Sequence, residues 1–159
     1  MAISLMPTVS INNKKLTLLS NNQHDAEIKL YTQFTDQKME PYPEVLEILE
    51  IWSKKCEIAV ASRTSYPPGA ESLLSLFGFE KYIKYKEIYP GCKHAHFKSL
   101  KNRSNFEYSE MLFFDDEPRN IRDLRKFGVE CVLVDSDIGV TKKLIQQTVD
   151  EKFLGAKLC

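Results

Sequence analysis

The sequence lacks the features of disulfide-rich, secreted and membrane-spanning proteins. Its four cysteines form no C-x-x-C pair. No apolar run approaches the roughly 18 residues of a membrane-spanning helix, and the N-terminus does not combine a basic start with an apolar stretch. We therefore expect no signal peptide and no membrane partner, and reduced thiols in a cytoplasmic, or alternatively nuclear, protein.

An excess of charge of either sign is also missing. Lysine and arginine together number 22, as do aspartate and glutamate. A balanced chain has no broad basic surface, so we expect no nucleic-acid partner. With 43% hydrophobic residues and only 6 glycines in 159, the composition excludes a disordered or collagen-like chain and suits one domain with a sizeable core.

The composition changes near residue 41. Residues 1–40 are polar without clear periodicity, and we expect this divergent segment to be disordered or to replace a first strand. From residue 41 to 159, apolar runs alternate with amphipathic segments, which predicts a three-layer α/β Rossmann-like fold: a parallel sheet with helices on both faces. Strands are expected near 57–61, 82–88, 111–114 and 130–134, and helices near 43–52, 70–77, 94–101, 118–127 and 141–153.

Polar residues follow three of the predicted strands. Ser62 and Arg63 follow the first apolar run, Lys93 follows the 82–88 segment, and Asp115 and Asp116 follow the MLFF run. Because ligands of parallel sheets bind beyond the carboxyl ends of the strands, we expect these side chains at one edge. A hydroxyl and two cations suit phosphate, and paired carboxylates suit Mg²⁺.

Each of these residues also has a structural interpretation. Ser62 and Thr64 can cap the following loop, Lys93 can be a solvated lysine, and Asp115 or Asp116 can be the N-cap of the helix that begins at 118. Adjacent aspartates are harder to explain in this way, because two acids repel each other unless positive charge lies beside them.

The segment CKHAH resembles a cluster of metal ligands. Its spacing matches no closed four-ligand zinc pattern, and no second ligand pair follows it. We therefore expect His94 and His96 to lie in a surface turn or at the start of a helix, with no zinc.

Five segments resemble a known family: YPEV (42–45), ASRT (61–64), EIYPG-K (87–93), LFFDDEPRNI (112–121) and GVECVLV (128–134). They look like the eukaryotic magnesium-dependent phosphatases of the haloacid dehalogenase (HAD) superfamily. The resemblance implies a HAD-like phosphatase domain over 41–159 without a large cap domain. It also implies hydrolysis of phosphomonoesters with Mg²⁺, acting on a phosphorylated protein (phosphotyrosine) or on a small phosphomonoester such as a sugar phosphate.

The resemblance assigns roles to the same five residues. Ser62 and Arg63 match the second motif of the family, which binds phosphate. Lys93 matches the third motif, which neutralises the transferring group and supports catalysis. Asp115 and Asp116 match the fourth motif, which holds Mg²⁺, without indicating which of the two does so.

The first motif of the family, D-x-D-x-T, is absent. It would supply the attacking aspartate and the general acid at the end of the first strand. No D-x-D precedes Tyr42, and the nearest strand-like stretch, Leu16–Leu19, is followed by Ser20 and Asn22. Neither side chain can replace an aspartate in this chemistry, and unless Leu16–Leu19 pairs in its place, the sheet loses its middle strand.

We therefore expect the catalytic nucleophile to be absent, hydrolysis to be impaired, and Mg²⁺ binding to be weakened or lost. Three alternatives remain open: a working phosphatase with an unplaced nucleophile, a non-catalytic relative that binds phosphate, Mg²⁺ or a protein partner, and a truncated splice product.

Overall fold

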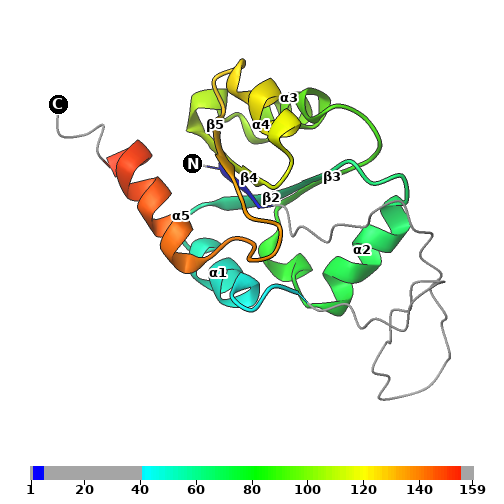
Figure 1. Cartoon of the computed structure of the whole chain (residues 1–159). Coiled ribbons are helices and arrows are strands. Elements are labelled where there is room, and N and C mark those ends of the chain that lie inside the picture. The colour runs from blue at the N-terminus through cyan, green and yellow to red at the C-terminus, as the bar shows by residue number, and fades with distance from the viewer. Residues whose placement is uncertain (1, 6–40, 155–159) are drawn as a thin grey trace, which may run out of the picture.

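The computed structural model describes residues 2–5 and 41–154, which form a parallel sheet between two layers of helices (Figure 1). The strand order is β3-β2-β1-β4-β5, and each neighbouring pair is parallel. The strands are β1 (Ala2–Leu5), β2 (Glu57–Ser62), β3 (Tyr85–Ile88), β4 (Met111–Asp115) and β5 (Glu130–Leu133).

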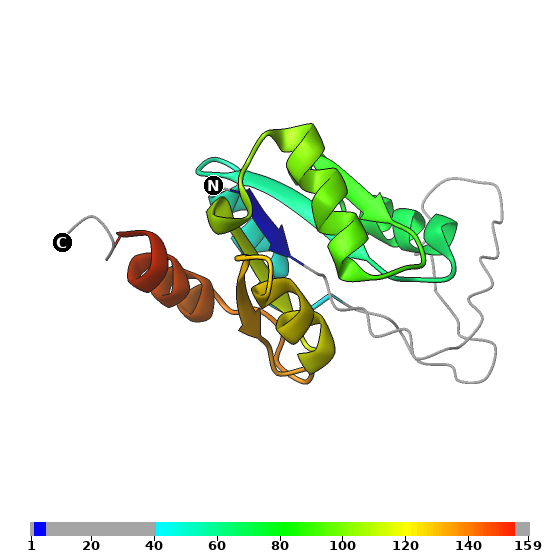
Figure 2. The same ribbon diagram turned by 90° about the horizontal axis from the view of Figure 1, so that it is seen from above.

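Helices cover both faces of the sheet. The α-helices are α1 (Val45–Trp52), α2 (Pro67–Leu76), α3 (Lys93–Ser104), α4 (Pro118–Arg125) and α5 (Lys142–Val149), with short 3-10 turns at Glu80–Tyr82 and Tyr108–Glu110 and a π-helical turn at Asp150–Leu154. The helices α3 and α4 lie together on one face, and α1, α2 and α5 lie on the other (Figures 1 and 2). This arrangement confirms the predicted three-layer α/β architecture.

Successive side chains of β4 alternate between two hydrophobic clusters, one on each face of the sheet. Leu112 and Phe114 belong to the cluster under α1, α2 and α5, whereas Met111 and Phe113 belong to the cluster under α3 and α4. All four side chains are at most 2% exposed. Successive side chains of a strand point to opposite faces, so a strand covered on both faces is apolar at every position. This explains the unbroken MLFF run.

The middle strand of the sheet is β1, which corrects the expectation for Leu16–Leu19. Ile3 is in register with Ile58 of β2 on one side and with Leu112 of β4 on the other. The described residues do not include Leu16–Leu19, Ser20 or Asn22. The prediction that the chain has no large cap domain concerns the same segment in part, so it stays a prediction.

All five helices differ by a few residues from their predicted bounds, among them α3 and α4 at their C-terminal ends. Helix α3 continues to Ser104 and ends where Asn105 adopts a φ of 61°, a left-handed conformation that asparagine tolerates. Helix α4 ends at Arg125, before Phe127, which is 41% exposed and stacks on His94 at a centroid distance of 3.8 Å. Within the described residues, no helix is long and apolar enough to cross a membrane.

A proline in the middle of β1 tests its central position. We expect Ser4→Pro to unfold most of the chain, because it removes a ladder N–H from a strand that pairs on both sides, and small domains have only about 5–15 kcal/mol of stability. Ser4→Thr keeps the N–H and suits a strand, so its urea midpoint, followed by circular dichroism, should stay close to that of the wild type. Equal midpoints for the two variants would place another segment in the middle of the sheet.

Candidate functional site

A buried ion pair lies where the carboxyl ends of the strands meet. Lys93 is the first residue of α3, and its Nζ lies 3.4 Å from Oδ2 of Asp115, the last residue of β4. Both side chains are only 1% exposed. The Lys93 ammonium also donates to the carbonyl of Ala61 on β2. The structure thus brings these predicted site residues together, and the interpretation of Lys93 as a solvated lysine is wrong.

Asp115 is held by donors on both carboxylate oxygens. Its Oδ1 accepts from the Glu117 N–H at 2.7 Å, and Asn120 Nδ2 lies 3.0 Å from Oδ1 and 3.1 Å from Oδ2. With Lys93, these contacts occupy about the four acceptor positions of a carboxylate. The N-cap of α4 is Glu117, so neither Asp115 nor Asp116 is the N-cap residue of that helix.

Burial changes the pKa values of two charged side chains at this edge of the sheet. It lowers the pKa of Lys93 to about 8, against the opposing effect of Asp115. Burial, and then the neighbouring Asp115 charge, raise the pKa of Asp116. Asp116 is partly exposed whereas Asp115 is buried, so of the two aspartates Asp116 is the more accessible to a cation from solvent.

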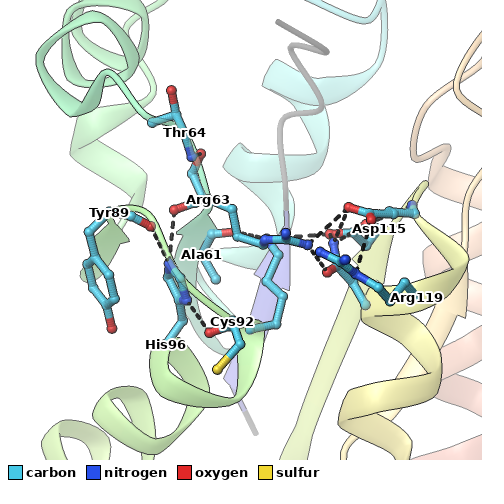
Figure 3. Close-up of polar contacts among 12 residues, drawn as sticks. Ala61, Arg63, Thr64, Tyr89, Cys92, His96, Asp115 and Arg119 are labelled. Carbon is cyan, nitrogen blue, oxygen red and sulfur yellow. Dashed lines mark hydrogen bonds and ion pairs between the residues drawn. The ribbon is translucent and has the colours of Figure 1, made fainter. Parts of the chain in front are cut away.

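Arg63 reaches the same network from the end of β2. Its Nη1 donates to Asn120 Oδ1 at 2.8 Å and to Glu117 Oε2 at 3.2 Å. Arg119 approaches the other oxygen of Glu117 at 3.5 Å, and Figure 3 shows Arg63, Asp115 and Arg119 gathered on this side. The Arg63 Nε atom is buried and has no hydrogen-bond partner within the described part of the chain.

Ser62 and Thr64 form the turn that follows β2. The Ser62 hydroxyl accepts from the Thr64 N–H at 3.4 Å, and the Thr64 hydroxyl accepts from the Tyr66 N–H at 3.1 Å. Their predicted capping of the following loop is confirmed. Because each hydroxyl only accepts in these contacts, its proton remains available to a ligand.

His96 is a buried member of this edge that the sequence did not reveal. It is the fourth residue of α3, so the prediction that it lies near the start of a helix is confirmed, but its exposure is 0%, so a surface position is wrong. Its ring contacts the backbone carbonyls of Ser62, Tyr89 and Cys92 (Figure 3). Only its spacing before Phe97 and Leu100 hints at a buried face, since the surrounding helix sequence is polar.

No carboxylate follows the central strand in the sequence. The three residues after Leu5 are Met6, Pro7 and Thr8. Across residues 2–5 and 41–154, no group of three or more His, Cys, Asp or Glu side chains is placed to hold a metal ion. The edge of the sheet therefore has its cations and one carboxylate pair, without a further acidic residue from β1.

Comparisons with solved structures place the sheet among HAD-like folds. A haloacid dehalogenase-like hydrolase from Streptococcus pneumoniae matches with a TM-score of 0.57 and 10% identity, over 67% of this chain and 52% of that one. The N-terminal part of a Bacteroides fragilis protein, containing a phosphatase domain complexed with Mg, matches with a TM-score of 0.57 and 18% identity, over 65% and 29%. At these identities the likeness shows the fold.

Sequence comparisons identify the family as well as the fold. Human magnesium-dependent phosphatase 1 is 43% identical over 105 residues, which are 65% of this chain and 60% of that protein. A HAD-like hydrolase superfamily protein of Schizosaccharomyces pombe is 37% identical over 98 residues, which are 55% and 56%. The chain thus spans less than two thirds of the length of these relatives. The acid phosphatase family model matches residues 13–152, and the chain belongs to that family.

Proposed function

We propose that this chain binds phosphomonoesters at the edge formed by β2, β4 and α3 but hydrolyses them poorly. The observation that carries the proposal is a contrast between two parts of one edge. The Lys93–Asp115 pair is buried and fully hydrogen-bonded, whereas Met6, Pro7 and Thr8 follow the central strand where the family chemistry needs carboxylates.

The available donors suit a phosphate group. The Arg63 Nε atom lacks a protein acceptor among the described residues, and the Ser62 hydroxyl keeps its proton for a ligand. The Lys93 ammonium lies between Ala61 and Asp115 at the same edge. Two cations and a hydroxyl give charge-assisted hydrogen bonds to phosphate oxygens, so these contacts support binding.

Hydrolysis by the two-aspartate chemistry of the D-x-D-x-T motif needs one carboxylate to attack phosphorus and a second to move a proton. Asp115 is a poor substitute for the first, because its oxygens are occupied by Lys93, Asn120 and the Glu117 N–H. Loss of a nucleophile commonly removes most of a rate enhancement that is typically at least about 10⁶-fold. We therefore infer that the chain is catalytically impaired.

The carboxylate pair fits Mg²⁺ in part. Magnesium is usually held by one or two carboxylates, with water and substrate phosphate completing its shell. The raised pKa of Asp116 marks a carboxylate that an added cation would stabilise. Asp115 would have to release one of its donors to act as the second ligand. When bound, the ion would neutralise phosphate charge, and we propose that it binds mainly through Asp116 and weakly.

The proposed ligands are a phosphorylated protein, carrying phosphotyrosine, or a small phosphomonoester such as a sugar phosphate. The proposed location is the cytoplasm or the nucleus. Within the described ranges, Cys56, Cys92 and Cys131 are free thiols, which is typical of a reducing compartment.

Phosphate binding without turnover is the first expected result. Inorganic phosphate and vanadate should raise the melting temperature, because a ligand that binds only the folded state stabilises it. The wild-type chain should hydrolyse an aryl phosphate in the presence of Mg²⁺ no faster than the Arg63→Met variant, which lacks a proposed phosphate ligand. In the same thermal assay, Arg63→Met should lose the phosphate-dependent shift, whereas Lys101→Met, which removes an exposed lysine of α3, should keep it.

Magnesium-dependent turnover that disappears in the Asp115→Asn/Asp116→Asn double variant would show a working enzyme and overturn the proposed impairment. The absence of any phosphate- or vanadate-dependent shift in the wild type would overturn the proposed binding.

Magnesium binding should depend on Asp116. In chelator-treated protein, added Mg²⁺ should raise the melting temperature of the wild type and leave that of Asp116→Asn unchanged. Asp137→Asn is the matched control. Burial raises the pKa of Tyr42, and the charges of Asp116 and Asp137 add to this rise, so both carboxylates act on the same ring while Asp137 lies outside the pair. Equal magnesium shifts in Asp116→Asn and the wild type would exclude Asp116 as the ligand.

The buried pair should be strongly coupled in stability. Lys93→Met should lower the free energy of unfolding by about 3–5 kcal/mol, because it leaves Asp115 buried without its cation. Lys93→Met/Asp115→Asn should recover part of this loss, giving a coupling energy of about 1–3 kcal/mol in urea denaturation. The exposed Lys101–Glu107 pair of the same face should give only about 0–1 kcal/mol. Additive losses at Lys93 and Asp115 would contradict the coupling.

A further inference from the structure

The ring of His96 is surrounded by hydrogen-bond acceptors. Its Nδ1 lies 2.9 Å from the Cys92 carbonyl oxygen, and its Nε2 lies 3.0 Å from the Ser62 carbonyl oxygen and 2.9 Å from that of Tyr89. Carbonyl oxygens only accept hydrogen bonds. Both ring nitrogens therefore face groups that require a donor.

A neutral imidazole has one N–H and one lone pair, so it satisfies only one side of this arrangement. The other nitrogen would point a lone pair at a carbonyl oxygen within 3.0 Å in a fully buried setting, which is costly. Nε2 lies within reach of two of the three carbonyl oxygens, so the tautomer with its N–H on Nε2 satisfies more of this arrangement than the other tautomer.

Tyr89 packs against the face of this ring. The two rings are stacked with centroids 4.1 Å apart and an angle of 6° between their planes, which holds the imidazole in place. Burial, together with a hydrogen bond to Glu87, raises the pKa of Tyr89 to about 12, so the phenol stays neutral. Glu87 is itself buried and paired with Arg103 at 2.6 Å.

The three carbonyls belong to the elements that carry the proposed phosphate ligands. Ser62 ends β2, and its carbonyl also accepts the Tyr89 N–H at 3.1 Å. Cys92 is the N-cap of α3 and directly precedes Lys93. A ring on α3 that donates to the Ser62 carbonyl fixes the Ser62 backbone relative to the first turn of α3, where Lys93 begins.

We propose that His96 is a positioning residue whose Nε2–H, shared between the carbonyls of Ser62 and Tyr89, clamps the end of β2 to α3 and so sets the geometry of the phosphate-binding edge. The effect on phosphate rests on the proposed function. The clamp itself is a property of the folded chain with no ligand bound, so the two are separately measurable.

The protonation state is tested in the wild-type chain by NMR with ¹⁵N-labelled histidine near neutral pH. Nε2 of His96 should show the shift of a protonated ring nitrogen. The chain has three histidines, and a His94→Gln sample removes one signal to aid assignment. A shift typical of an unprotonated nitrogen at Nε2 would overturn the clamp, whatever the outcome with phosphate.

The clamp is tested with His96→Leu and His96→Gln in the full chain. His96→Leu removes every ring donor, so hydrogen exchange at the Tyr89 N–H should accelerate and affinity for inorganic phosphate should fall, each about tenfold. His96→Gln supplies two amide donors at one end and should recover part of both losses. His94→Gln, on the same helix but stacked on Phe127, should match the wild type.

The outcomes separate the two proposals. If the wild type does not bind phosphate, the proposed function fails, and hydrogen exchange at Tyr89 still decides the clamp. If the wild type binds phosphate and His96→Leu keeps both wild-type affinity and wild-type exchange, the positioning role is wrong. A His96→Leu variant that fails to fold leaves the NMR result on the wild type and the His96→Gln measurements to decide.

Discussion

The buried pair of Lys93 and Asp115 is the contact on which the edge of the sheet depends. It joins the first residue of α3 to the last residue of β4, and the same ammonium holds the Ala61 carbonyl of β2. Three elements distant in sequence therefore meet at one charged atom. Burying two charges is costly unless the remaining donors and acceptors are also satisfied, and Asn120 and the Glu117 N–H satisfy the remaining acceptors of Asp115.

Helix α3 combines this polar role with packing. Phe97 and Leu100 bury its face in the cluster with Phe113, at an aromatic centroid distance of 5.0 Å for the Phe97–Phe113 pair. The same face presents Lys93 and His96 toward the ends of β2 and β4. Apolar packing therefore sets the depth of the helix against the sheet, and the polar contacts at its first two turns set its position along the strands.

Much of this fold was predictable from the sequence because both faces of the sheet are covered. Complete burial makes β4 apolar at each of its first four positions, a pattern that is easy to detect. The convergence of Lys93 and Asp115 followed from the rule that parallel strands present their carboxyl ends at one edge. The four residues of β1 are too short for a periodic pattern, and only pairing on both sides identifies that strand. His96 was missed because its partners are backbone carbonyls, which leave no trace in a sequence.

The contacts that order this edge also limit what Asp115 can do. A carboxylate that accepts from Asn120, the Glu117 N–H and Lys93 is held in one orientation, and any attack on phosphorus or ligation of a metal must first break one of these bonds. Asp116 is partly exposed, and burial, followed by the adjacent Asp115 charge, raises its pKa. Under the proposed function, binding of phosphate and catalysis of its transfer are separable, because the residues that satisfy charge at the edge are different from the carboxylates that would have to react.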